Sequence, residues 1–183
     1  MSIPAPKHPR IAPLERPDGR PALNIFNTLA NNRPLMKGFM GLGAHLLQDG
    51  LIEPRDREIV ILRVGWRAGA EYEFSQHVTI GRDAGLSDAE ISRLSDVSSR
   101  EWSVNDLALI DLADELCAHD VVSESTWHAL AQRFSDAQML ELLILDGFYR
   151  MVSGMLNSVG VALEDGASGW PEGSTPTRWA PRS

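Results

Sequence analysis

The chain has 183 residues, of which 43% are hydrophobic and 23% are charged, as is usual for one globular domain rather than a disordered or fibrous chain. The formal net charge of −8, without a run of basic residues, disfavours nucleic acid and anionic membranes as partners. The single cysteine, Cys117, excludes an intrachain disulfide and a CxxC motif. We expect a cytoplasmic protein, because the sequence has neither a signal-peptide core nor a run of about 18 apolar residues.

Prolines recur every few residues in the first 20 positions, and proline does not propagate a helix. We therefore predict an N-terminal arm over residues 1–20 and, from a similar pattern, a C-terminal tail over 166–183. The domain itself is predicted over 21–165. Trp170 and Trp179 carry large apolar surfaces, so at least one of them should pack against the protein.

Between the arm and the tail, apolar residues recur at helical spacing. Pro34 and Pro54 are each placed to open a helix, since proline is tolerated in the first helical turn. Another helix follows Ala70 and runs to Gly85. The apolar run over 59–64 would serve equally well as a buried strand on periodicity alone.

Serines mark the starts of the later predicted helices, because a serine hydroxyl accepts a backbone N–H of the first turn. These residues are Ser87, Ser103, Ser123 and Ser135. The last helix, over residues 136–163, is apolar on nearly all sides, which is typical of a fully buried helix. We expect a second subunit to cover part of it.

Glu73 and His77 are four residues apart, so they lie on one face of the predicted helix. A carboxylate beside an imidazole suits general acid/base chemistry near neutral pH. Glu58 precedes the apolar run, and a carboxylate near a core requires a partner. Both features also have structural interpretations: an exposed pair for Glu73 and His77, and a salt bridge from Glu58 to Arg55, Arg57 or Arg63.

Three segments, RDREIVILRV at 55–64, AEYEFSQH at 70–77 and IGRDAGLSDAEI at 80–91, resemble the core of the carboxymuconolactone decarboxylase family. That family includes the alkylhydroperoxidase D-like proteins. The resemblance extends more loosely from Asn27 through FYRMVSGMLNSVGV at 148–161. It implies an all-α, alkylhydroperoxidase D-like helical bundle and favours helix over the ambiguous run. It also implies an obligate homo-oligomer, a trimer or hexamer, with a dimer-based assembly as another option.

The chain departs from the peroxidase branch of this family, whose motif places two cysteines between a glutamate and a histidine. Glu58 and His77 match the glutamate and the histidine, whereas Ala70 and Glu73 occupy the cysteine positions. Peroxide reduction needs a thiolate and a resolving thiol, so peroxidase activity is disfavoured. The decarboxylase branch often lacks one or both cysteines, and the resemblance implies a lyase or isomerase that needs no cofactor and no metal.

The implied reaction is general acid/base chemistry on a small cyclic or aromatic-derived acid, lactone or ketone, through an enolate-like anion. His77 would protonate carbon, Glu73 would orient His77 or act as a second base, and Glu58 would complete a relay. Arginine holds carboxylates bidentately, and an aromatic ring could form a pocket wall. The candidates for substrate binding are therefore Tyr72, Arg63, Arg67 and Arg150.

Two alternatives remain open at this stage. The chain could be a non-catalytic oligomeric binding or scaffold protein, in which Glu58, Glu73 and His77 form a buried network between subunits. Redox activity through Cys117 is the other. We expect a small molecule and further copies of the chain as partners.

Overall fold

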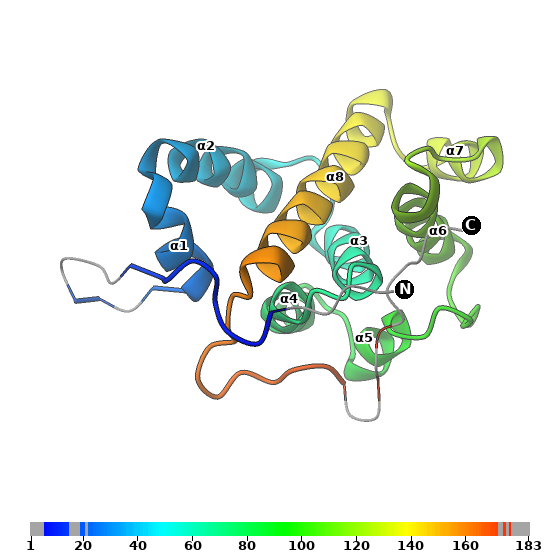
Figure 1. Ribbon diagram of the computed structural model, residues 1–183. Helices are drawn as coiled ribbons and strands as arrows, with labels where there is room; N and C mark the ends of the chain where they lie inside the picture. Colours follow the sequence, from blue (N-terminus) through cyan, green and yellow to red (C-terminus); the bar gives the residue numbers. More distant parts are fainter. Residues whose placement is uncertain (1–5, 15–18, 21, 172–173, 175, 177–183) are drawn as a thin grey trace.

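The computed structural model describes residues 6–14, 19–20, 22–171, 174 and 176, and among these residues it is all-helical with no strand. Its central helix, α3, packs against α4, α6 and α8 (Figure 1). The α-helices are α1 (Asn24–Leu29), α2 (Arg33–Ala44), α3 (Pro54–Arg67), α4 (Glu71–Asp83), α5 (Asp88–Leu94), α6 (Val104–His119), α7 (Glu124–Ala131) and α8 (Asp136–Val159). A 3₁₀ turn, η1 (Ala30–Asn32), precedes α2, and a π-helical turn, η2 (His45–Asp49), follows it.

Helix α3 explains the ambiguity of the apolar run over 59–64. Neighbouring helices cover it on every side, so each residue from Asp56 to Trp66 is buried. A helix buried on all faces carries a continuous apolar sequence, and the helix that the family resemblance favoured is confirmed. Buried charges need partners, and Asp56 of this helix accordingly pairs with Arg133.

The predicted helix starts are confirmed by their caps. Four serine side chains each accept the backbone N–H three residues ahead, in the pairs Ser87 with Glu90, Ser103 with Asp106, Ser123 with Thr126 and Ser135 with Gln138. Each such cap contributes about 1 kcal/mol to stability. The end of the last helix was predicted wrongly. It stops at Val159 because Gly160, with φ of 76°, forms a left-handed C-cap.

Helix α8 is less enclosed than its sequence indicated. Leu140, Ile144 and Met151 are 64%, 48% and 55% exposed, and their spacing places them on one side of the helix. This apolar stripe, Leu140, Ile144 and Met151, lies uncovered in the single chain. Among the described residues, no helix combines the length and hydropathy that a membrane span requires.

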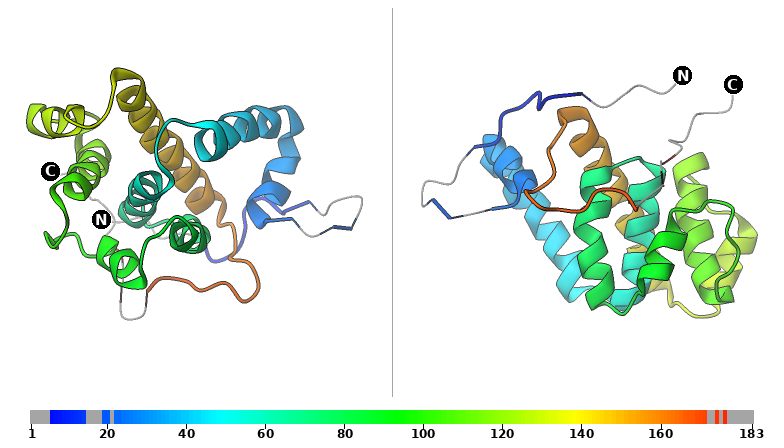
Figure 2. Two further views of the ribbon diagram at one scale, coloured as in Figure 1. Left: turned by 180° about the vertical axis from the view of Figure 1, so that it is seen from behind. Right: turned by 90° about the horizontal axis from the view of Figure 1, so that it is seen from below.

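The described parts of the arm and tail run along the outside of the helices (Figure 2). The backbone N–H of Arg10 donates to the carbonyl of Val159 over 2.7 Å. Trp170 packs its ring edge-on against Trp66, with 5.1 Å between ring centroids, which confirms that a tail tryptophan packs on the protein. Trp179 lies outside the described residues, and the predicted boundaries of arm, domain and tail stay predictions.

Candidate functional site

The imidazole of His77 lies between two carboxylates. Its Nδ1 is 2.6 Å from Oε2 of Glu58, and its Nε2 is 3.1 Å from Oε1 of Glu73. Helix α3 supplies Glu58, and α4 supplies the other two from positions one helical turn apart. All three side chains are nearly enclosed, at 5% exposure for His77, 0% for Glu58 and 6% for Glu73. Both ring nitrogens therefore face a buried carboxylate.

Arg57 extends this arrangement by one member. Its Nε donates to Oε1 of Glu58 over 2.9 Å, and its Nη1 donates to the carbonyl of Leu47 in η2 over 2.9 Å. The salt bridge and the acid/base pairing, which were alternatives from the sequence, are both present. We name the chain Arg57, Glu58, His77 and Glu73 the relay.

The charge of His77 follows from its partners. Burial alone would lower its pKa, but the hydrogen bonds and charges of Glu58 and Glu73 outweigh burial and raise the pKa of His77 to about 9. The ring is therefore an imidazolium at neutral pH. Since carboxylates and cations alternate along the relay, its charges cancel, which lowers the cost of burying them.

Glu73 is the member of the relay that has an unpaired carboxylate oxygen. Its Oε1 faces His77. Its Oε2 has no hydrogen-bond partner among the described residues, but it is not completely enclosed by protein atoms. Glu73 also lies in the first turn of α4, where the helix dipole favours a negative charge. Among the four carboxylate oxygens of the relay, Oε2 of Glu73 is therefore the one that neither Arg57 nor His77 contacts.

Tyr149 belongs to the site, although the sequence interpretation left it out. Its ring stands edge-on to His77, at 5.0 Å between centroids and 86° between ring planes. Burial, with the nearby charges of Glu73 and Glu58, raises the pKa of its phenol. An aromatic residue at helical spacing is usually core, and only its place in the segment 148–161 that resembles the family pointed to it.

Arg63, which was predicted to bind substrate, is engaged in contacts within the protein. Its side chain is 2% exposed, and its Nε and Nη2 each donate to Asp114 of α6 over 2.7 Å. Its Nη1 donates to the carbonyl of Leu94 over 2.7 Å. Every nitrogen of the guanidinium is engaged, so Arg63 joins α3 to α5 and α6.

Arg67 and Arg150, the other arginines predicted to bind substrate, both contact α6 or its C-terminal end. Arg67 lies 3.4 Å from Asp114. Nη1 of Arg150 donates to the carbonyl of Leu116 over 2.9 Å and to Asp120 over 2.8 Å. Substrate binding by Arg63, Arg67 and Arg150 therefore stays a prediction.

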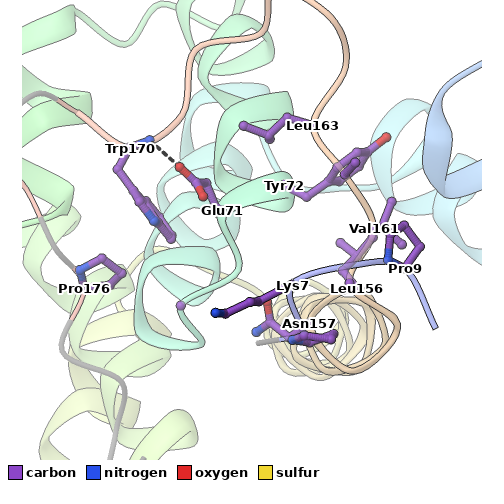
Figure 3. A pocket seen from close by; sticks show the side chains of 14 residues that line it. Lys7, Pro9, Glu71, Tyr72, Leu156, Asn157, Val161, Leu163, Trp170 and Pro176 are labelled. Atoms are coloured by element: carbon purple, nitrogen blue, oxygen red, sulfur yellow. Dashed lines mark hydrogen bonds between the residues drawn. The ribbon is translucent and has the colours of Figure 1, made fainter. Parts of the chain in front are cut away.

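Tyr72 does line a cavity, of about 430 Å³, but Glu58, Glu73 and His77 are not in its wall. Figure 3 shows the Tyr72 hydroxyl pointing away from Lys7 and Glu71, which also line the cavity. That hydroxyl donates to Glu164 over 2.6 Å and accepts the N–H of Ile25 over 3.2 Å. Its hydrogen bonds hold α1 and the segment that follows α8 to α4, and its role as a wall of the substrate site stays a prediction.

Cys117 lies in α6 and is partly buried. Burial raises the pKa of its thiol to about 12, so the thiolate that redox chemistry requires is not formed at neutral pH. The geometry thus gives no support to redox activity through this residue. Within the described ranges, no three or more His, Cys, Asp and Glu side chains are grouped so that they could hold a metal ion.

Comparison with known proteins places this fold and site in context. Residues 33–99 match the carboxymuconolactone decarboxylase family, and this range includes the whole relay. Among curated protein sequences, none is significantly similar to the chain.

Solved structures share the fold at low sequence identity. A protein of unknown function from Agrobacterium tumefaciens superposes with a TM-score of 0.68 at 19% identity, over 74% of this chain and 94% of that one. An uncharacterized peroxidase-related protein with an alkylhydroperoxidase AhpD core, from Ralstonia eutropha, gives a TM-score of 0.70 at 20% identity, over 78% and 77%. The debrominase Bmp8, as a cysteine-to-alanine variant with 2,3,4-tribromopyrrole, gives 0.71 at 16%, over 86% and 93%. Residues 33–99 are therefore similar to the carboxymuconolactone decarboxylase family, and the all-α fold of the chain is similar to that of AhpD-like structures.

Proposed function

We propose that the protein is a cofactor-free lyase or isomerase that moves protons on the carbon of a small cyclic or aromatic-derived acid, lactone or ketone. The observation that carries this proposal is the relay, in which a buried imidazolium joins Glu58 to Glu73 and leaves one Glu73 oxygen without a partner among the described residues. The roles of Glu73 and His77 are reversed from those the sequence favoured. Glu73 exchanges protons with the substrate. His77 positions the carboxylate of Glu73 and balances its negative charge.

In an isomerisation, Oε2 of Glu73 removes a proton from the carbon next to a carbonyl group. The C–H electron pair moves toward the carbonyl oxygen and forms an enolate. The protonated Glu73 then returns its proton to another carbon. In a decarboxylation, the bond to the carboxylate carbon breaks instead, carbon dioxide leaves with that carbon, and a protonated Glu73 protonates the resulting enolate. After an isomerisation Glu73 is again a carboxylate, whereas after a decarboxylation it takes up a proton from water before the next turnover.

The family match supports a lyase of this type. The similar structure of a debrominase holds 2,3,4-tribromopyrrole, a small ring, and this supports a small cyclic substrate for the shared fold. Both Glu73 and Ala70 stand where the peroxidase motif has cysteines. The proposal therefore concerns proton transfer and not peroxide reduction.

Replacing Glu73 with glutamine tests the proposal. The protein is incubated in D₂O with cyclohexanone, γ-butyrolactone and 4-oxocyclohexanecarboxylate, and deuterium uptake next to the carbonyl is followed by NMR. The wild-type protein should accelerate uptake into at least one compound. Glu73→Gln should slow that uptake at least about 100-fold, the usual scale for a general base, with its thermal unfolding midpoint retained.

Glu71 provides the matched control, since it lies in the same helical turn but is exposed. Glu71→Gln should exchange deuterium at the wild-type rate. The proposal is wrong if wild-type protein accelerates uptake into none of the compounds, or if Glu73→Gln exchanges as fast as Glu71→Gln.

The near-complete burial of the relay is the observation that favours the other candidate, a non-catalytic oligomeric binding or scaffold protein. In that case Glu73→Gln would lower thermal stability or dissociate an oligomer, and deuterium uptake would match the uncatalysed rate with both variants. The same set of measurements therefore separates the two functions.

We further propose that the protein is a homo-oligomer in which the apolar stripe Leu140, Ile144 and Met151 packs against another copy. Exposed apolar patches of this kind mark interaction surfaces. Ile144→Glu should reduce the mass measured by size-exclusion chromatography with light scattering. Val104→Glu, at a valine that is 79% exposed and lies on α6, should leave the mass unchanged. A wild-type protein that is monomeric at micromolar concentration would contradict this proposal.

A further inference from the structure

Arg57 and Glu58 are neighbours in the sequence of α3, and neighbouring residues of a helix point in directions about 100° apart. Their contact, 2.9 Å from Arg57 Nε to Glu58 Oε1, is therefore not produced by helix geometry alone. The long arginine side chain has to be held in place to make it. The second contact of Arg57, from Nη1 to the carbonyl of Leu47 over 2.9 Å, holds it there.

Leu47 can accept this hydrogen bond because of its place in η2. This π-helical turn ends at Asp49, and the last carbonyl groups of a helix have no partner within the helix. Turns of this kind are rare and are frequently found at functional sites. Arg57 is 8% exposed, so its guanidinium joins the relay to the end of η2 within the protein.

Few contacts fix the position of η2. Helix α2, all of whose residues are described, has none that is buried, and Leu46 is the buried residue of η2. Directly after η2, the N–H groups of Leu51 and Ile52 donate to Glu141 of α8 over 2.8 and 3.2 Å. The segment between α2 and α3 thus runs beside α8 (Figure 2). A movement of this segment would act on the relay through Arg57.

The two oxygens of Glu58 have different partners. Oε1 accepts from Arg57, and Oε2 lies 2.6 Å from Nδ1 of His77. Because a carboxylate is planar, a contact that fixes Oε1 also fixes the direction of Oε2. Burial lowers the pKa of His77, and the hydrogen bond of Glu58 is the largest of the influences that raise it. The orientation of Glu58 therefore affects the charge of the ring.

We infer that Arg57 is a positioning residue, which orients Glu58 toward His77 and ties the relay to η2. The guanidinium does so with two nitrogens of one planar group, Nε for Glu58 and Nη1 for Leu47. Lysine carries the same charge on a single nitrogen and does not reproduce both contacts. The inference deepens the proposed function, and it rests on that function only for its effect on turnover.

Arg57→Lys tests the inference, because it retains the positive charge and removes the second donor nitrogen. With ¹⁵N-labelled histidine, the titration of His77 should move to lower pH by about one unit, the scale of one hydrogen bond to a charged group. Arg55→Lys is the matched control, since Arg55 lies in the first turn of α3 but pairs with Glu90 and Asp106. It should leave the titration unchanged. An unchanged titration in Arg57→Lys would overturn the inference.

Glu141→Ala tests the tie to η2 without altering the relay. It removes the acceptor of the Leu51 and Ile52 N–H groups, so the titration of His77 should again move to lower pH. Glu124→Ala, at an exposed glutamate of α7, should leave the titration unchanged. A wild-type titration in Glu141→Ala would overturn the tie between η2 and the relay.

Deuterium uptake separates this inference from the proposed function. Arg57→Lys should lower kcat at least about 10-fold, the scale of a misplaced catalytic group. KM should stay the same, because the substrate contacts Glu73 and not Arg57. A raised KM with an unchanged kcat would contradict a positioning role. If wild-type protein accelerates uptake into none of the compounds, the proposed function fails, and the His77 titrations still decide the role of Arg57.

Discussion

The free energy of unfolding should fall by about 3 kcal/mol as pH rises through the interval from about 6.5 to about 9, and His77→Gln should remove this fall. The reason is that the pKa of His77 is raised from 6.5 to about 9 in the folded protein. Between these values the native state binds a proton that the unfolded chain has released. The stabilisation is therefore complete below about pH 6.5 and is lost as pH rises through about 9.

Urea unfolding of both proteins at several pH values measures this effect. Other groups also make stability depend on pH, since burial raises the pKa of Asp146 to about 7 and that of Cys117 to about 12. Both contributions are present in wild-type and variant protein alike, so the difference between the two proteins isolates His77. A difference that does not change between pH 7 and pH 9 would show that the imidazole is not held as a cation.

Arg63→Met should destabilise the protein by about 1.5 to 3 kcal/mol, because the enclosed guanidinium loses its charge-assisted hydrogen bonds to Asp114, which keeps only the longer contact with Arg67. The substitution also leaves the carbonyl of Leu94 without its donor. A methionine retains most of the apolar stem, so the loss reports the guanidinium contacts. If Arg63 bound substrate instead, the variant would lose activity and keep its stability.

Arg82 is the matched control for this measurement. It pairs with Asp88 over 2.7 Å, but both side chains are more than half exposed, and exposed pairs contribute about 0 to 1 kcal/mol. Arg82→Met should therefore have a denaturation midpoint close to that of wild type. Equal midpoints for Arg63→Met and Arg82→Met would contradict the structural role that we assign to Arg63.

Much of the fold could be predicted from local signals. A serine at a helix start accepts the backbone N–H of the residue three positions ahead, so this contact depends on the local sequence alone. Ser87 and Ser135 could therefore be identified without knowing the tertiary structure. Gly160 was also visible, but a glycine in an apolar run is not a helix end until its backbone adopts positive φ. Pro54 marked a helix start, but the run over 59–64 itself carried no periodic signal, because burial on every side erases periodicity.

The candidate site was predictable to the extent that its members share one helix. Glu73 and His77 are placed together by the helical repeat, whereas Glu58 reached the site only through the family resemblance. Which acid lies opposite an arginine depends on how α3 and α8 pack against α6, so the partners of Arg63 and Arg150 could not be inferred. Tyr149 was missed for the same reason, since its contact with His77 joins α8 to α4.

The titration of the His77 ring by NMR tests the central claim most directly, namely that Glu58 and Glu73 hold one imidazolium between them. With ¹⁵N-labelled histidine, both ring nitrogens of His77 should remain protonated up to about pH 8 and titrate near pH 9. In Glu73→Gln the titration should move toward lower pH, because one of the two carboxylates is lost. A His77 ring that titrates at or below about pH 6.5 in the wild-type protein, with no change in Glu73→Gln, would contradict the relay.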